Sequence, residues 1–165
     1  TECLDMRLPP HARALDLGCA VGRASFELAR YCEKVIGVDN SKLFIDAARA
    51  IQKQGFLEYS ILEEGVKTGW RKALRPGSVA PDRVEFVCED ALEFCRSSAP
   101  FNVVLIANLI CRLKDPKALL ETLPASIVSG GQLIDFSLHL AGGIYAACEL
   151  AGWTGEPQSD FRNSI

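Results

Sequence analysis

A short glycine loop and a carboxylate that follows it by twenty-one residues have the composition and spacing of a nucleotide site. Gly18 and Gly22 enclose Cys19-Ala20-Val21, directly after the apolar run Arg13–Leu17. Glycine allows the chain to turn tightly and leaves room for a ligand against backbone amides. Asp39 lies where a carboxylate after a second strand can accept both hydroxyls of a ribose. These residues predict a site for an adenosine-containing ligand.

Three details distinguish between adenosine cofactors. A dinucleotide fingerprint needs G-x-G-x-x-G, whereas the loop between Gly18 and Gly22 has no third glycine at the required step. Asp16 suits a cationic sulfonium or amino group better than a pyrophosphate. Asp90, just after a later strand, offers a polar contact to the edge of adenine. The pattern favours S-adenosylmethionine over NAD or FAD, and an NAD-dependent oxidoreductase is the less favoured alternative.

The elements that must position these residues alternate between strands and helices. Apolar, β-branched runs predict strands at 13–17, 34–39, 83–88, 101–108 and 132–136, and helical spacing predicts helices at 23–31, 41–54, 91–96 and 116–123. This order predicts an α/β fold, a Rossmann-like parallel sheet with right-handed crossovers and helices on both faces. Phe101–Asn108 is the most apolar run and is expected to be the central strand.

In such a sheet, ligands bind outside the carboxyl ends of the strands. The Gly18–Gly22 loop, Asp39, Asp90 and Asn108 all follow strands, so we expect them to share one edge of the sheet.

Two segments give weaker signals. Phe56–Leu62 is compatible with an extra strand or a helical turn, and Glu63–Pro81 is expected to be a long loop. Trp70 in that loop either covers a site or anchors a solvated basic segment. Near the end of the chain, Ala141–Gly152 is compatible with a loose helix.

Length, charge and cysteine content exclude several classes of function. The 165 residues predict one domain over 1–165, and a formal charge of −3 argues against nucleic acid or an anionic membrane as the main partner. No apolar run is long enough for a membrane span, and no signal peptide is evident. Seven cysteines without a C-x-x-C pair indicate reduced thiols in a cytoplasmic protein, with no metal site.

Four stretches together resemble a known family. They are Leu15–Ala29 (LDLGCAVGRASFELA), Phe44–Ala48 (FIDAA), Glu63–Gly65 (EEG) and Ala107–Pro116 (ANLICRLKDP). The chain is similar to class I S-adenosylmethionine-dependent methyltransferases, and within them it resembles the methyltransferase domain of ovothiol synthesis. The resemblance covers about residues 13–136 and implies methylation of an imidazole nitrogen of 5-thiohistidine (4-mercaptohistidine), with S-adenosylhomocysteine as product. Members of that family are often fused to an iron-dependent sulfoxide synthase.

The resemblance also implies roles for individual residues. Asp16, Gly18, Ala20 and Gly22 would hold the methionine end of the cofactor, Asp39 the ribose, Asp90 and Ala91 the adenine, and Asn108 would face the transferring methyl group. Cys19 and Asn40 complete the predicted cofactor-binding set, Cys19 as a small side chain under the loop rather than a redox group. A neutral imidazole has a free lone pair and needs no strong base, so we nominate no catalytic residue.

The segment after residue 136 departs from the family pattern. Ser137–Gly143 does not match the family's continuation, and the twelve residues before Arg13 are too few for a synthase domain. We therefore expect a core at 13–136, a divergent tail at 137–165, and a sheet that lacks its last strands. Such a sheet would expose the edge of its fifth strand. A truncated, non-catalytic binding or interaction module, dimeric through that edge, is the alternative to an enzyme.

Overall fold

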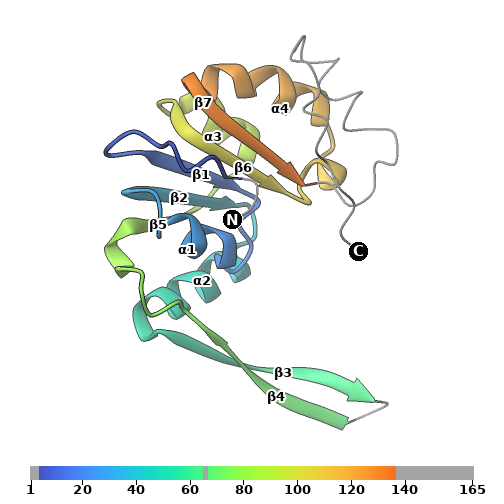
Figure 1. Ribbon diagram of the computed structural model, residues 1–165. Helices are drawn as coiled ribbons and strands as arrows, with labels where there is room; N and C mark the ends of the chain where they lie inside the picture. Colours follow the sequence, from blue (N-terminus) through green and yellow to red (C-terminus); the bar gives the residue numbers. More distant parts are fainter. Residues whose placement is uncertain (1–3, 65–66, 137–165) are drawn as a thin grey trace, which may run out of the picture.

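Five parallel strands form the centre of the computed structural model, which describes residues 4–64 and 67–136 (Figure 1). Their order in the sheet is β5-β2-β1-β6-β7, and every neighbouring pair is parallel. The strands are β1 (Arg13–Leu17), β2 (Lys34–Asp39), β5 (Val84–Cys88), β6 (Phe101–Ala107) and β7 (Ile127–Phe136). This confirms the predicted Rossmann-like fold.

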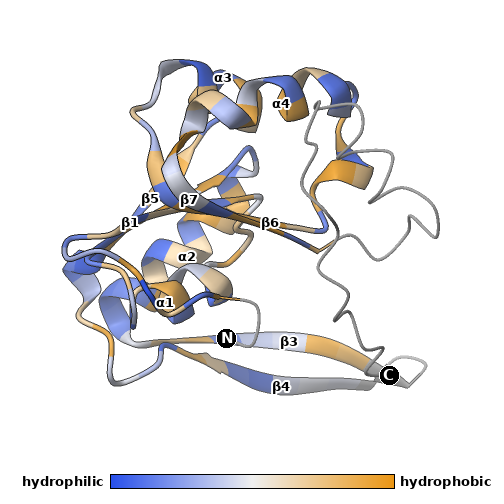
Figure 2. Cartoon of the chain, turned by 45° about the horizontal axis from the view of Figure 1, so that its top comes forward, coloured by the Kyte–Doolittle hydropathy of each residue, from blue (hydrophilic) through white to orange (hydrophobic). Residues whose placement is uncertain are grey.

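Helices cover both faces of the sheet, as Figure 2 shows. On one face lie α1 (Arg23–Leu28) and α2 (Lys42–Gln54), and on the other α3 (Ala91–Ser97) and α4 (Pro116–Thr122). Short 3-10 turns at Ile110–Arg112 and Leu123–Ser126 connect α4 to its neighbouring strands, and a third at Pro81–Arg83 precedes β5. The two hydrophobic clusters between sheet and helices follow the alternation of each strand, because successive side chains point to opposite faces.

Polar caps and a glycine define the helix ends that the sequence predicts. The side chain of Asp90 accepts hydrogen bonds from two backbone N–H groups of α3, and Asp115 accepts one from Ala118 N at 3.0 Å at the start of α4. Gly55 ends α2 with a φ of 84°, a conformation that glycine adopts without strain. One end was predicted wrongly, since α1 stops at Leu28 rather than at residue 31.

The apolar run that begins at Phe101 forms an interior strand, but the middle of the five-stranded sheet belongs to β1. β1 has β2 on one side and β6 on the other, and Leu15 and Leu17 are fully buried. β6 lies between β1 and β7 and is equally apolar, so burial alone does not distinguish the two positions.

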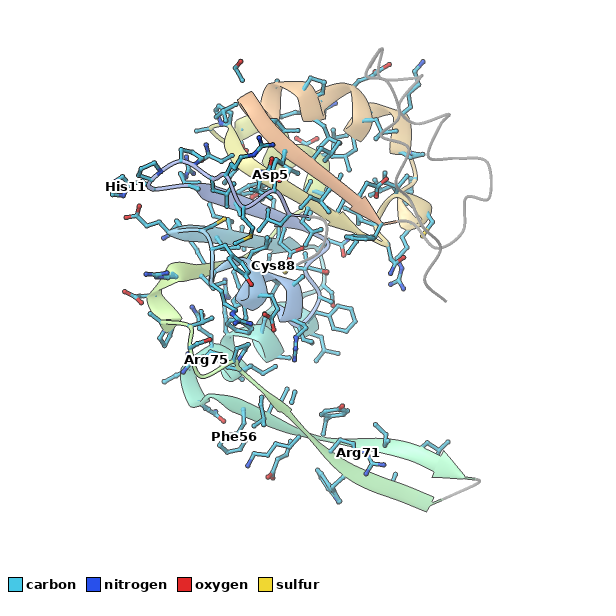
Figure 3. All side chains as sticks on the ribbon, viewed as in Figure 1. Asp5, His11, Phe56, Arg71, Arg75 and Cys88 are labelled. Carbon is cyan, nitrogen blue, oxygen red and sulfur yellow. The ribbon has the colours of Figure 1, made fainter. Side chains whose placement is uncertain are left out.

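An antiparallel hairpin projects from the body between α2 and β5 (Figure 1). It consists of β3 (Phe56–Glu64) and β4 (Lys67–Leu74) and forms its own two-stranded sheet. Figure 3 shows Phe56 near its base and Arg71 farther along it. The prediction of a long loop over 63–81 is therefore wrong for Lys67–Leu74. Trp70 is 73% exposed on this hairpin, so it does not cover a site within the described residues.

β7 is longer than the strand predicted at 132–136 and also includes Gly130 and Gly131. Ile127 pairs with Phe101, and Gln132 pairs with Val103, so extra residues of β7 form a bulge between these pairs. Gly130 adopts a φ of 74° inside this bulge. The expectations for the segment after Phe136, including a helix at 141–152, lie outside the described residues.

No helix in residues 4–64 and 67–136 has the length and apolar character needed to cross a membrane.

Candidate functional site

The carboxyl ends of the strands bring the predicted site residues to one edge of the sheet. The backbone N–H groups of Gly18 and Cys19 donate to the carbonyl oxygen of Val38, at 2.8 and 3.0 Å, so the loop crosses onto β2. Beyond the next strand, Glu89 N donates to the carbonyl oxygen of Asp39 at 3.2 Å. At the other side, Asn108 N donates to the carbonyl oxygen of Phe136 at 2.7 Å. The edge is thus continuous from β5 to β7.

Three residues of the glycine loop adopt left-handed backbone conformations. The φ angles are 74° at Gly18, 47° at Ala20 and 84° at Gly22. Ala20 is therefore strained, because a Cβ disfavours this region. Gly22 has a second constraint, since a Cβ there would lie 2.4 Å from the ring of Phe86. Only glycine fits between the loop and β5 at this position.

Asp39 links the glycine loop to the start of α2. Its Oδ2 accepts a hydrogen bond from Ala20 N at 3.0 Å, and its Oδ1 accepts one from Ser41 N at 2.8 Å. A carboxylate oxygen has capacity for a second donor, so each can still accept a hydroxyl. The half-buried Asp39 therefore retains acceptor capacity at both of its oxygens.

Asp16 lies between β1 and α1 rather than on the open surface of the site. The residue is 1% exposed, and its Oδ2 accepts a 2.5 Å hydrogen bond from the hydroxyl of Ser25. Burial raises the pKa of Asp16 from 3.8 to about 6, although the bond from Ser25 opposes this and the charge of Asp39 adds to it. A cation above the loop would favour the ionised form.

Cys19 has the environment of a structural thiol. It is buried, and its Sγ donates weakly to the carbonyl oxygen of Ala20 at 3.8 Å. Burial, with the nearby charges of Asp16 and Asp39, raises the pKa of the Cys19 thiol far above its usual range. The thiolate needed for redox chemistry is therefore disfavoured.

The predicted adenine side is formed by the ends of β2 and β5. Asp39 pairs with Cys88 in the sheet, and Asp90, two residues beyond Cys88, caps α3 with one oxygen at Leu92 N (2.9 Å). Ala91 is buried against the sheet, whereas Asn40 is exposed with its carbonyl oxygen 3.8 Å from the Sγ of Cys88. Asp90 and Asn40 thus flank the same end of the edge.

Asn108 begins the loop after β6 in a left-handed conformation, with φ of 54°. Asparagine tolerates this region better than most residues. Leu109, which follows, lies against the loop, because a Cβ at Gly18 would lie 3.2 Å from its side chain. Asn108 is therefore held next to the glycine loop.

A cavity of about 280 Å³ lies beside the edge, between α1 and the strands β6 and β7. Its lining is mostly apolar and includes Leu28, Leu105, Ala107, Ile134 and Phe136. His, Cys, Asp and Glu side chains do not gather in any group of three or more that could bind a metal in the described part of the chain.

Sequence reasoning missed Ser25 and Phe86. Ser25 lies on the first turn of α1 and satisfies the buried Asp16, and Phe86 packs beneath Gly22. Both contacts join a strand to a different element, so periodicity along the chain carries no signal for them. The sequence offers one hint of the contact between Ser25 and Asp16: a serine stands on the inner face of an otherwise apolar helix that follows a strand carboxylate.

Residues 15–135 match the family model described as a methyltransferase domain, and the chain belongs to this family. The comparison with curated proteins gave no match.

Solved structures with the same fold include several methyltransferases. A TehB-like S-adenosylmethionine-dependent methyltransferase from Corynebacterium glutamicum is 19% identical with a TM-score of 0.60, covering 88% of this chain and 65% of that one. The N-methyltransferase NodS from Bradyrhizobium japonicum, solved with S-adenosylhomocysteine, is 20% identical with a TM-score of 0.53. The match covers 75% of this chain and 51% of NodS. A precorrin 8w decarboxylase from Methanobacterium thermoautotrophicum is 18% identical with a TM-score of 0.59, covering 85% of this chain and 61% of its own.

Membership of the family confirms the prediction of a class I methyltransferase fold with S-adenosylmethionine as cofactor. It removes the support for an NAD-dependent oxidoreductase. At these identities the structural matches show the fold alone, and one of them is named as a decarboxylase, so the acceptor has to be argued from the site.

Gly22→Ala and Gly55→Ala form a matched pair that measures the packing beneath the loop. Both positions have φ of 84°, but a Cβ at Gly55 meets nothing within 4 Å. Gly55→Ala should cost about 1–2 kcal/mol of unfolding free energy from backbone strain. Gly22→Ala should cost at least about 1 kcal/mol more, because Phe86 must move. Urea unfolding measures both; equal losses would contradict the tight contact.

Asp16 should make stability decrease as the pH rises. The folded state binds its proton more tightly than the unfolded chain, so stability is lost between about pH 4 and the folded pKa of about 6. The loss amounts to at most about 3 kcal/mol. Asp16→Asn keeps an acceptor for Ser25 and should flatten this decline in urea unfolding between pH 4 and 7. Asp46→Asn, an exposed control on α2, should retain the decline. If the free energy of unfolding of Asp16→Asn still falls with pH as in the wild type, the pKa of Asp16 is not raised by folding.

Proposed function

We propose that this chain binds S-adenosylmethionine across the Gly18–Gly22 loop and transfers its methyl group to a small molecule. The observation that carries the proposal is the position of Asp39. Its two oxygens fix the glycine loop and the start of α2 while each retains room for one more donor. A vicinal ribose diol is a ligand that satisfies both.

The other residues fit the remaining parts of the cofactor. The second oxygen of Asp90 is available to an amino group at the edge of adenine, since the first caps α3. Asp16, one layer below the loop, attracts a cationic sulfonium or amino group through a site of low dielectric. Gly18, Ala20 and Gly22 turn the backbone so that the chain clears the space above β1.

The bound cofactor supplies an electrophilic methyl group on sulfur, and the protein aligns the acceptor and excludes water. Asn108 and the loop after β6 border the place where the acceptor must approach. Proton abstraction by a strong base is not required when the acceptor is a neutral nitrogen with a free lone pair.

For the acceptor, we propose an imidazole nitrogen of 5-thiohistidine, as in ovothiol biosynthesis. The support is the resemblance of Leu15–Ala29 and Ala107–Pro116 to that family, because these segments form the glycine loop and the loop beside Asn108. Fusion to a sulfoxide synthase domain in the parent protein and a cytoplasmic location belong to the same proposal.

A non-catalytic interaction module is the second candidate. Among the described strands, β7 pairs only with β6, so its other edge presents unpaired backbone groups. A second copy of the chain could pair there as a dimer.

Binding of S-adenosylhomocysteine tests the cofactor site. Isothermal titration calorimetry should show binding to the folded chain, weakened at least tenfold in Asp39→Asn, because an amide offers the ribose one acceptor oxygen instead of two. Asp46→Asn, an exposed carboxylate of α2 paired with Lys42, should bind normally. Equal affinity in the wild-type chain and Asp39→Asn would remove Asp39 from the site.

A methylation assay tests the acceptor. With S-adenosylmethionine, the chain should methylate 5-thiohistidine on an imidazole nitrogen. Histidine, which lacks the thiol, should be methylated at least tenfold more slowly. Turnover of an unrelated acceptor would reject the ovothiol assignment. Cofactor binding without methylation, in a dimer that Ile134→Pro in β7 dissociates, would favour the interaction module.

A further inference from the structure

Asp135 is the one polar member of an otherwise apolar row of side chains. The register of the sheet aligns Val87, Val38, Leu17, Ile106 and Asp135 on the face covered by α3 and α4. Leu17, Val38 and Ile106 are fully buried. Ile134 and Phe136 line the cavity on the opposite face, as strand alternation requires. A leucine or valine would complete the row.

One oxygen of the Asp135 carboxylate lacks a hydrogen-bond donor among the described residues. Its Oδ1 is buried and accepts no hydrogen bond from any described residue, and no described lysine or arginine forms an ion pair with it. Burial raises its pKa. Asp16, which is fully buried, has Ser25 as its partner, whereas the half-buried Asp135 has none for its Oδ1 among the described residues. Leaving a buried acceptor without a donor costs about 1–3 kcal/mol, so Asp135 weakens the fold.

Asp135 lies at the acceptor side of the site. It is one residue from the end of β7, and the carbonyl oxygen of the next residue, Phe136, accepts from Asn108 N. Following the strand order β5-β2-β1-β6-β7, the edge carries Asp90, Asp39, the glycine loop, Asn108 and then Asp135. Neighbouring strands are about 4.8 Å apart. If adenine, ribose and sulfonium follow the first three strands, the methyl group lies near β6 and the acceptor near β7.

We propose that Asp135 binds a protonated amino group of the methyl acceptor, which makes the substrate class small molecules that carry an ammonium group. The inference rests on the proposed function, since it requires the cofactor to occupy β5, β2 and β1. An ammonium group supplies both the hydrogen bond and the positive charge that the buried oxygen lacks. 5-Thiohistidine, with its α-amino group, belongs to this class.

The test compares acceptors with and without the amino group. The probes are 5-thiohistidine and its des-amino analogue, in which hydrogen replaces the α-amino group. The wild-type chain should prefer the amino-bearing acceptor at least tenfold in kcat/KM. Asp135→Asn should remove most of this preference through a higher KM, with binding of S-adenosylhomocysteine unchanged. Asp82→Asn, an exposed carboxylate at the opposite end of the sheet, should behave like the wild type.

A stability measurement separates acceptor binding from a structural role. Asp135→Leu should unfold at a higher urea concentration than the wild type while losing the preference, because the leucine completes the apolar row. A destabilised Asp135→Leu with an unchanged preference would assign Asp135 to the fold and overturn the inference. Normal cofactor binding without any preference for the amino group in the wild type would also overturn it. Failure of the wild type to bind S-adenosylhomocysteine would instead reject the proposed function and the inference together.

Discussion

The paired hydrogen bonds of Asp39 are the constraint on which the site depends. One carboxylate holds Ala20 in a left-handed conformation and fixes the start of α2 at the same time. The strain at Ala20 persists only because surrounding contacts over-determine it: the loop is also tied to Val38 by two backbone bonds and packed over Phe86 at Gly22. The ligand surface is therefore already formed before a cofactor arrives, which lowers the ordering cost of binding.

The two carboxylates near the glycine loop, Asp16 and Asp39, differ in their burial and in their hydrogen-bond partners. Asp16 is enclosed and carries a raised pKa, whereas Asp39 is half-buried and bonded to backbone donors. Two carboxylates near one loop repel each other, and a cationic ligand relieves that repulsion. A positively charged sulfonium is a better partner for this arrangement than a phosphate would be. The cofactor class follows from charge as well as from loop geometry.

The sequence predicts the parallel sheet well, because four of its strands are largely apolar runs and three of its four helices begin at a side-chain cap, such as Asp90 or Asp115. It fails at β4, where Trp70 and its neighbours are exposed and no burial pattern marks a strand; the pairing with β3 is what makes it one. The grouping of Gly18, Asp39, Asp90 and Asn108 at one edge follows from strand ends alone. The contact between Asp16 and Ser25 does not, because it depends on how α1 packs on β1. The thiohistidine acceptor depends on a sequence resemblance finer than the family match, so it remains a prediction.

The middle position of β1 has a consequence for the order of folding. β1 pairs with β2 nearby in the chain, but its other partner, β6, is far away: Ala14 lies opposite Val103, eighty-nine residues later. During synthesis, β1, β2 and β5 can associate while the second edge of β1 stays open until β6 leaves the ribosome. Such long-range pairing is slow, and an open apolar strand edge is prone to pair with other chains. We expect nascent chains that end before β6 to be the species that most needs a chaperone.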